Sequence, residues 1–352
     1  MRPAGTERDA LAETVRAVLR RHADTDPWSV LCEQVGVAAL AIPEEHGGAG
    51  GGVAELAVVA RELGRELVGC PFLGSSVLTT LAILETGDTQ DHSRLLPGLA
   101  EGSVVGALAW TSATGRWCPD EVACTATAST DRYIVDGTAH YVLHGDSAGL
   151  LLVLAETGDG LALIEVDPAQ SGVRVSGTPA MDRSRSFARI ELTQATGRRV
   201  GPGDARAALR QVRDLSCAVL AAEQAGAAAR ALEITVAYSL EREQFGRPIG
   251  GFQALKHRMA DLHVLVETAW SAAEAAAEPG PDQARLATVA KAWCSRALSE
   301  VAAEMIQLHG GIGITWEHPA HRYFKRAHSS AELFGPPHQH LARLAEMAGV
   351  GG

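Results

Sequence analysis

The chain has 352 residues, of which 46% are hydrophobic and 21% charged, and its formal net charge is -11. This is the composition of a globular protein with room for two or three subdomains, not of a disordered segment. The acidic balance, with no basic stripe to offset it, argues against a nucleic-acid partner. No apolar run reaches the ~20 residues that a membrane span needs, and the first residues lack the apolar centre of a secretory signal.

The first part of the chain, 1–102, is predicted to be an N-terminal helical domain. Apolar and charged residues alternate at helical spacing over 9–21 and again over 53–67, and a further helical stretch covers 75–85. Between the first two, Pro43 and the five glycines that follow it predict an irregular connection.

The middle part, 103–198, is predicted to be a β domain. Helical periodicity disappears, and short runs rich in Thr, Val and Ile alternate with Gly and Asp at intervals of roughly ten residues. This pattern indicates a small antiparallel barrel or sandwich. The runs are VVGALAW, EVACTATAS, YIVDGTAHYVL, LLLVLAE, LALIEV, GVRVSG and FARIEL.

The last part, 199–352, is predicted to be a C-terminal four-helix-bundle domain. Helical patterns cover 205–241, 252–277 and 282–309, and two shorter ones come after them. The Glu-Pro-Gly-Pro break at 278–281 separates the second pattern from the third. Helices, then strands, then helices give an α+β fold class.

Cysteine and histidine usage predicts a cytoplasmic protein without a metal site. The six cysteines are scattered and form no Cys-x-x-Cys pair, which is typical of small buried hydrophobic residues in a reducing compartment. Several histidines crowd the C-terminal part, but they lack a His-Glu-x-x-His or comparable ligand spacing.

The segment 242–253, REQFGRPIGGFQ, is the most informative stretch. It connects two long helical patterns and carries Arg242, two glutamines and four glycine or proline residues. Such a connection can aim a guanidinium and amides at a polyanion while the flanking helices hold it rigid. The alternative is that Gly246, Pro248 and Gly250 are only turn punctuation.

Over nearly its full length the chain resembles the acyl-CoA dehydrogenase family. The motifs that carry the resemblance are AIPEEHGGAG at 41–50, REQFGRPIGGFQALKHRMADL at 242–262 and QLHGGIGITWEHPAHRYFKRA at 307–327. They look most like those of actinobacterial members that act on sterol or other ring-bearing acyl-CoA thioesters. The resemblance implies an acyl-CoA substrate, FAD as cofactor, and the family fold with a β domain between two helical domains.

The resemblance also implies a cofactor site. In the family, the connector arginine meets the pyrophosphate of the neighbouring subunit's FAD, and the glycine turn receives the adenosine half, where glycine allows close backbone approach. Because these groups serve a partner's cofactor, at least a dimer is implied. The alternative for the turn is a plain helix C-cap at Gly310. The matching residues are Arg242, Gln244, Phe245, Gln253, Gln307, Gly310 and Gly311.

The catalytic base is less well defined. By the resemblance, a base removes the proton α to the thioester carbonyl while the β-hydride passes to the flavin, giving a 2-enoyl-CoA. The family's two usual glutamate positions hold Phe334 and Ser216 here, and neither can take a proton. Glu332 lies two residues from the first position and needs a bulge to reach it, and Asp214 faces away from the second.

The candidate base is therefore Glu223. It returns to the helix face of Ser216 about two turns, ~10 Å, along. Its small apolar neighbours would desolvate the carboxylate, which suits a general base. The alternative is a buried glutamate hydrogen-bonded to a neighbouring helix or to a polar substrate tail.

Three basic residues near the C-terminus, Arg322, Lys325 and Arg326, fall on helical spacing. They are typical of a solvated face, and the alternative is that they meet the phosphates of a nucleotide.

The β domain departs from the family's flavin motifs. ALAWTSATGRW and GTAHYVLHGDSAG stand where members carry Thr-Glu-Pro, Gly-Ser-Asp and Lys-x-Trp-Ile-Thr, and only Thr111 matches the first threonine. The chain keeps the groups that reach a neighbour's FAD and lacks many that hold its own. This favours one subunit of a heteromeric dehydrogenase, with a second dehydrogenase subunit and an electron-transfer flavoprotein or similar acceptor as partners. Alternatives are a homo-oligomer, a non-catalytic partner subunit, and a flavin oxidase or monooxygenase of the same fold.

Overall fold

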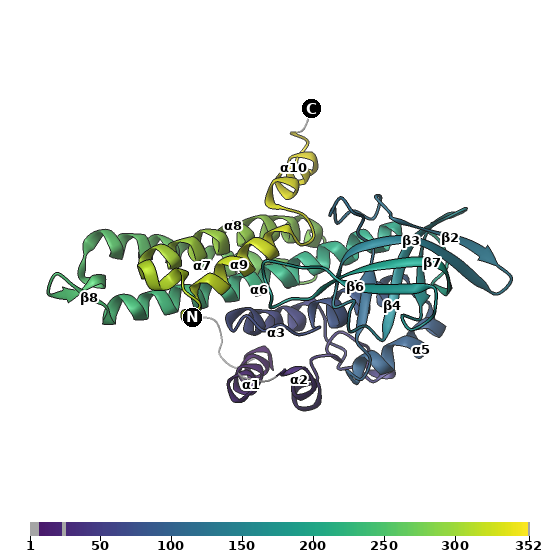
Figure 1. The fold of residues 1–352 in the computed structure, drawn as a ribbon, viewed down its shortest axis with the longest axis horizontal. Helices are drawn as coiled ribbons and strands as arrows, with labels where there is room; N and C mark the ends of the chain where they lie inside the picture. The colour runs from purple at the N-terminus through teal and green to yellow at the C-terminus, as the bar shows by residue number, and fades with distance from the viewer. Residues whose placement is uncertain (1–6, 23–25, 351–352) are drawn as a thin grey trace. The chain divides into compact units, whose positions relative to one another are not determined.

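The structure, a computed structural model, describes residues 7–22 and 26–350 (Figure 1). It confirms the α+β architecture, with helices first, a β region next and helices last. Tertiary contacts define two compact units. The β-containing unit holds the described part of 1–56 and Gly69–Ser216, and the helical unit holds Ala57–Val68 and the described part of 217–352. The three-domain division at 102/103 and 198/199 follows changes of secondary structure and stays a prediction.

The helices of the β-containing unit form where apolar residues recur at helical spacing. The first helix buries Ala12, Val15, Val18 and Leu19 on one face. The last begins at Asp88, whose side chain accepts hydrogen bonds from the backbone N–H groups of Gln90 and Asp91, both at 2.9 Å. These helices are α1 (Glu7–Arg21), α2 (Trp28–Val35), η1 (Glu44–His46), η2 (Leu73–Thr79), α4 (Thr80–Thr86) and α5 (Thr89–Ala100).

All the predicted β runs are strands, and they form one sheet. The pairings β4–β2, β2–β3, β3–β7, β7–β5 and β5–β4 close a ring, so the sheet is a barrel. The expected antiparallel order holds except at β4, which runs parallel to both β1 and β2. The strands are β1 (Gly106–Ala109), β2 (Cys124–Ser129), β3 (Arg132–Leu143), β4 (Leu150–Thr157), β5 (Gly160–Val166), β6 (Val173–Gly177) and β7 (Phe187–Val200).

Small side chains fill the barrel. Inward positions alternate with exposed ones, as along β2, where Cys124 and Ala126 are buried between exposed threonines. Many of the other buried residues are alanines, among them Ala139, Ala155 and Ala188. An interior this narrow leaves room for side chains only, which makes the barrel a rigid scaffold.

The helical unit consists of long helices joined by short turns. Helices α7 and α8 pack along each other, as do α8 and α9, and a small hairpin closes the connection between α6 and α7 (Figure 1). Its elements are the end of α3 (Val53–Arg65), most of α6 (Arg206–Glu241), β8 (Glu243–Gln244), β9 (Arg247–Pro248), η3 (Ile249–Gly251), α7 (Gln253–Ala277), α8 (Gln283–His309), η4 (Gly310–Ile314), α9 (Ala320–Glu332) and α10 (Pro337–Met347). Over 7–22 and 26–350, no helix has the length and apolar character that a membrane crossing requires.

Candidate functional site

The connector between α6 and α7 is a two-residue β-hairpin. Gln244 pairs with Arg247, and Phe245 and Gly246 at the tip both have positive φ, 54° and 75°. Two successive residues with left-handed backbone conformation form the turn of a two-residue hairpin, and both turn positions favour glycine or asparagine. A phenylalanine at the first position is therefore strained. Phe245 is also 92% exposed. Strained residues of this kind are concentrated at functional sites, so Phe245 is a candidate contact for another molecule.

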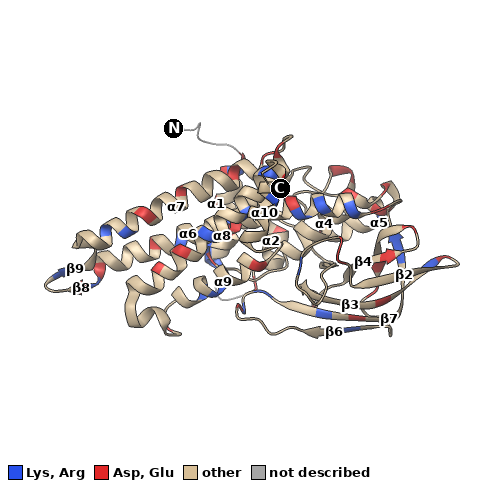
Figure 2. Cartoon of the chain, turned by 90° about the horizontal axis from the view of Figure 1, so that it is seen from above, with Lys and Arg blue, Asp and Glu red and all other residues tan. Residues whose placement is uncertain are grey.

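Contacts within the connector keep it rigid. The Arg247 guanidinium lies 4.0 Å from the ring centroid of Phe252, and the Phe245 ring meets that of Phe252 edge-on at 6.1 Å. The backbone N–H of Ile249 donates to the carbonyl of Arg242 at 2.7 Å and closes the base of the hairpin. The Arg242 side chain forms no hydrogen bond or ion pair with any residue in the described ranges. Figure 2 shows basic residues at this tip.

The structure brings this hairpin next to the turn that follows α8. Tyr238, one helical turn before Arg242, stacks on His309 with ring centroids 4.3 Å apart, and its hydroxyl donates to the His309 carbonyl at 3.4 Å. His309 directly precedes Gly310. Two segments far apart in the sequence, which the family resemblance assigns to one cofactor, therefore lie side by side in the helical unit.

Gly310 ends α8, as the C-cap alternative predicts, with φ 62° and ψ -143°. Its N–H meets the carbonyls of Gln307 and Ile306. Few residues other than glycine adopt this conformation. A Cβ built on Gly310 or Gly311 meets no atom within 4 Å, so the space over the turn is open. The C-cap and the open surface are compatible, because a bound group can approach the bare backbone.

Every residue predicted to bind the cofactor lies on the exposed surface of the helical unit. Their exposure shows that they are accessible to a group from outside the chain. They are Arg242, Gln244, Phe245, Gln253, Gln307, Gly310 and Gly311.

Histidines surround the glycine turn. The rings of His309 and His318 lie 4.2 Å apart, and His309 Nδ1 contacts the carbonyl of Met305 at 2.7 Å. His309 Nε2 is buried and finds no hydrogen-bond partner within the part of the chain that the structure describes. Burial lowers the pKa of His309, and the pKa of His318 is lowered first by burial and then by the charges of His309 and His321.

This cluster predicts that acid destabilises the helical unit. With a pKa below the ordinary value, each folded-state histidine resists a proton that the unfolded chain accepts, so the free energy of unfolding falls as the pH drops through the ordinary histidine range. Urea unfolding of wild type and His318→Gln at about pH 7.5 and about pH 5.5 measures this, and the variant should lose part of the pH dependence. His263→Gln, whose side chain is 66% exposed, is the control. An identical slope in wild type and His318→Gln contradicts the prediction.

Glu223 is buried, as expected, but its surroundings are not purely apolar. Its Oε1 accepts from Nη1 of Arg326 at 2.7 Å, and the two residues are 6% and 1% exposed. The other arm of Arg326 donates to the carbonyls of Leu67 at 3.4 Å and Val68 at 3.2 Å. The prediction of a solvated face is therefore wrong for Arg326, which is a buried cation with a carboxylate beside it.

The small residues around Glu223 form a helix-packing seam. A Cβ on Gly64 of α3 would lie 2.1 Å from the carbonyl oxygen of Glu223, and a Cβ on Gly226 would lie 2.1 Å from that of Arg61. Only glycine permits this approach of α3 to α6. Helix packing at this seam explains the small residues around Glu223, so a substrate is not needed to explain them.

Of the other positions considered for a base, Asp214 alone is a buried carboxylate, and it is paired with Arg213. Phe334 is 1% exposed with φ 59°, and His340 Nε2 contacts its carbonyl at 3.0 Å. Glu332 is exposed at the end of α9. Ser216 is fully buried, and Asp214 accepts from the neighbouring Arg213 at 3.1 Å.

Lys291 is a buried residue that the sequence analysis missed. Its Nζ donates to Ser295 Oγ at 3.0 Å and to the carbonyls of Ala331 at 2.9 Å and Gly335 at 3.2 Å. This ammonium ion fixes both ends of the turn that contains Phe334. No local pattern marked it, because its acceptors are backbone carbonyls about forty residues away in the chain.

The β-containing unit has unsatisfied polar atoms where the family places its flavin contacts. Thr111 Oγ1 and Trp110 Nε1 are buried, and among the described residues neither has a hydrogen-bond partner. Buried polar atoms without a partner are uncommon, and a bound ligand is one way to satisfy them. The residues present therefore fit a polar ligand here, although the full motif is missing.

The fold and the family match place the chain among the FAD-dependent oxidoreductases. Two family profiles match the chain, the acyl-CoA dehydrogenase N-terminal domain over residues 6–103 and the C-terminal domain over residues 207–348. The chain belongs to the acyl-CoA dehydrogenase family.

Relatives match along nearly the whole chain. Acyl-CoA dehydrogenase IpdE2 of Mycolicibacterium smegmatis is 40% identical over 96% of this chain and 97% of its own length. IpdE2 of Mycobacterium tuberculosis is 42% identical over 96% of each. Among solved structures, a variant of the Tcur3481–Tcur3483 steroid ACAD has 32% identity, a TM-score of 0.86 and 98% coverage of both chains. A chain of the ChsE4–ChsE5 complex from Mycobacterium tuberculosis has 28% identity, a TM-score of 0.88 and the same coverage.

Proposed function

We propose that this chain is one subunit of a heteromeric acyl-CoA dehydrogenase that converts a bulky or ring-bearing acyl-CoA into its 2-enoyl-CoA. The observation that carries the proposal is the surface hairpin of the helical unit. Phe245 is 92% exposed in a strained conformation, and Arg242 has no partner within the described ranges. An exposed aromatic residue beside an arginine of this kind is typical of a surface that another molecule covers.

The residues of this surface fit FAD held mainly by an adjacent subunit. Arg242 would bind the diphosphate through its fork of N–H donors, and the open backbone at Gly310 and Gly311 would admit the adenosine half. Beside Arg242, the bound FAD would also contact Gln244, Phe245, Gln253 and Gln307. When bound, FAD supplies the acceptor for the β-hydride of the acyl thioester.

The proton acceptor is proposed to come from the partner subunit. Protonation of Glu223 would leave the buried Arg326 guanidinium without its counter-charge, so the ion pair supports a structural role for Glu223 rather than the role of base. With Phe334 and Ser216 at the family's usual positions, this chain offers no better acceptor there.

Similarity to named relatives supports the substrate and partner assignments. One solved relative is called a steroid ACAD, and another is a complex of two different chains. By analogy, we assign to this chain a ring-bearing acyl group, a second dehydrogenase subunit and an electron-transfer flavoprotein or similar acceptor. All six cysteines are free, which supports a reducing cytoplasm as the location.

Co-expression tests the proposal. The chain is purified alone and after co-expression with a candidate second dehydrogenase subunit from the same organism, and bound flavin per chain is measured by absorbance. We expect the isolated chain to hold little flavin and to lack dehydrogenase activity, and the complex to have both. A yellow, active homo-oligomer of this chain would refute the shared site. Consumption of oxygen with release of peroxide would favour an oxidase instead.

A further inference from the structure

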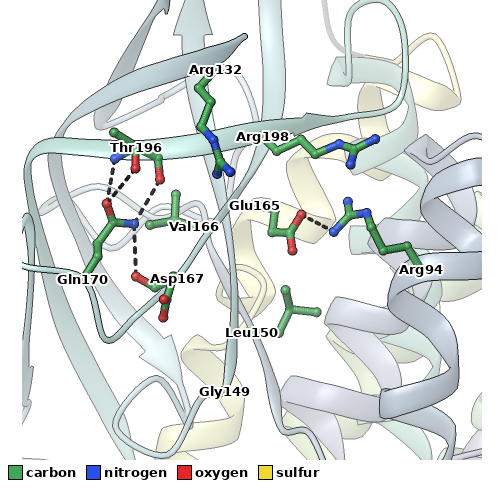
Figure 3. A pocket seen from close by; sticks show the side chains of 10 residues that line it. All are labelled: Arg94, Arg132, Gly149, Leu150, Glu165, Val166, Asp167, Gln170, Thr196 and Arg198. Atoms are coloured by element: carbon green, nitrogen blue, oxygen red, sulfur yellow. Dashed lines mark hydrogen bonds and ion pairs between the residues drawn. The ribbon is translucent and has the colours of Figure 1, made fainter.

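A polar pocket of about 720 Å³ opens on the β-containing unit (Figure 3). It lies where the ends of β3, β4, β5 and β7 meet α5 and the loop after β5. None of the residues predicted to bind the cofactor lines it. Its lining is Arg94, Arg132, Gly149, Leu150, Glu165, Val166, Asp167, Gln170, Thr196 and Arg198.

Two arginines that line this pocket, Arg132 and Arg198, are exposed to solvent. Glu165 and Arg198 are direct cross-strand neighbours on β5 and β7, a register at which opposite charges usually pair. Instead, Glu165 Oε2 accepts from Arg94 at 2.5 Å, and Arg94 also binds Asp91 at 3.1 Å. Within the part of the chain that the structure describes, Arg198 and Arg132 form no ion pair, and both line the pocket, with the Arg198 side chain extending toward Arg94 (Figure 3).

One wall of the pocket is held rigid by Gln170. Its Oε1 accepts from the N–H of Thr196 at 2.8 Å and from the Thr196 hydroxyl at 3.1 Å. Its Nε2 donates to the carbonyls of Thr196 at 2.9 Å and Asp167 at 3.1 Å. Because all these groups are satisfied, the loop after β5 is fixed against β7 and the pocket is largely formed in advance.

The lining selects the chemistry of a ligand. Two unpaired guanidinium groups in a chain of net charge -11 form a local site for a doubly charged anion, and guanidinium forks match phosphate oxygens. Asp167 adds an acceptor: its Oδ1 takes the N–H of Ala169 at 2.8 Å, and its Oδ2 has no partner among the described residues. A carboxylate beside a phosphate site can accept hydrogen bonds from the hydroxyl groups of a ligand.

We propose that this pocket binds a phosphorylated polyhydroxy compound, such as a sugar phosphate or the phosphoribosyl part of a nucleotide. Arg132 and Arg198 bind the phosphate, and Asp167 accepts from a ligand hydroxyl. A volume of about 720 Å³ is within the ~300–1,000 Å³ range of small-molecule sites. This site shares no residue with the proposed cofactor surface and does not depend on the proposed function.

Calorimetric titration of the purified full-length chain tests the assignment, with ribose 5-phosphate and inorganic phosphate as probes. We expect saturable binding of ribose 5-phosphate that is about tenfold tighter than that of phosphate, and about tenfold weaker in Arg132→Gln and in Arg198→Gln. Arg198→Lys, which keeps the charge but not the fork, should fall between wild type and Arg198→Gln.

Arg174→Gln is the matched control, because it removes an arginine with an 82% exposed side chain from the same barrel but outside the pocket. It should bind as wild type does. Absence of saturable binding to wild type overturns the site, and so does binding by Arg132→Gln and Arg198→Gln that is as tight as that of wild type. Equal affinity for the two probes overturns the assignment to a polyhydroxy compound.

Discussion

Glu223→Ala is expected to lower the free energy of unfolding by about 3–5 kcal/mol, the usual cost of removing one partner from a buried ion pair. The variant leaves Arg326, which is 1% exposed, with carbonyl oxygens but without the carboxylate at 2.7 Å. Urea unfolding followed by circular dichroism measures the loss from the midpoint and slope.

Two further variants identify the ion pair as the cause. Replacing both partners, Glu223→Leu with Arg326→Met, should cost less than Glu223→Ala alone, because no buried charge remains. Glu233→Ala removes a carboxylate from a partly exposed pair with Arg65 in the same unit and should cost less than about 1 kcal/mol. If Glu223→Ala were no more destabilising than Glu233→Ala, the pair would not have the structural role assigned to it.

A second substitution at Glu223 tests whether this glutamate has a structural or a catalytic role. Glu223→Gln keeps the shape of the side chain but removes its charge. A base would lose turnover in the assembled enzyme while the variant stayed as stable as wild type. A structural partner of Arg326 would lose stability, and the folded fraction would keep its turnover. Measuring both quantities on one preparation decides between them.

Sequence periodicity was sufficient for most elements because local spacing determines them. The predicted helix over 205–241 is α6, and every predicted β run is a strand. Two helices were missed, α2 with 8 residues and α5 with 12. For α5 a signal was present, since Asp88 precedes the first turn as an N-cap, but Pro97 inside the segment obscured the helical pattern.

Long-range pairs could not be predicted from the same patterns. Arg326 and Glu223 are 103 residues apart, and Arg326 follows two other basic residues at helical spacing that is typical of a solvated face. Only the packing of α9 within the helical unit buries it. The parallel pairing of β4 with β1 and β2 was missed for the same reason, since strand direction in a sheet depends on partners that period-two alternation does not specify.

For the predicted cofactor residues, position and binding role have to be distinguished. Family motifs predicted that the hairpin and the glycine turn serve one ligand, and the Tyr238–His309 stack shows that the two segments lie together. Their binding role stays a prediction that Arg242 tests most directly.

Arg242→Ala in the assembled enzyme should weaken FAD binding about a hundredfold, because truncating one member of a buried charge pair costs several kcal/mol. The measurement is reconstitution of the flavin-free complex with FAD, followed by flavin fluorescence. Arg296→Ala is the matched control, since it removes an arginine of α8 whose side chain is 65% exposed and which pairs with Glu300 at 3.8 Å. Undiminished FAD affinity in Arg242→Ala would show that the hairpin serves packing between subunits instead.

Arg242→Lys sharpens this test. A lysine keeps the positive charge, but its ammonium group cannot form two parallel hydrogen bonds with a diphosphate. Affinity between those of wild type and Arg242→Ala indicates that the fork geometry contributes beyond charge. Affinity equal to that of wild type indicates a point-charge contact, for which the rigid hairpin, closed by the 2.7 Å hydrogen bond from Ile249 to Arg242, would be unnecessary. The strain at Phe245 therefore favours the intermediate result, because a strained turn is retained where side-chain direction matters.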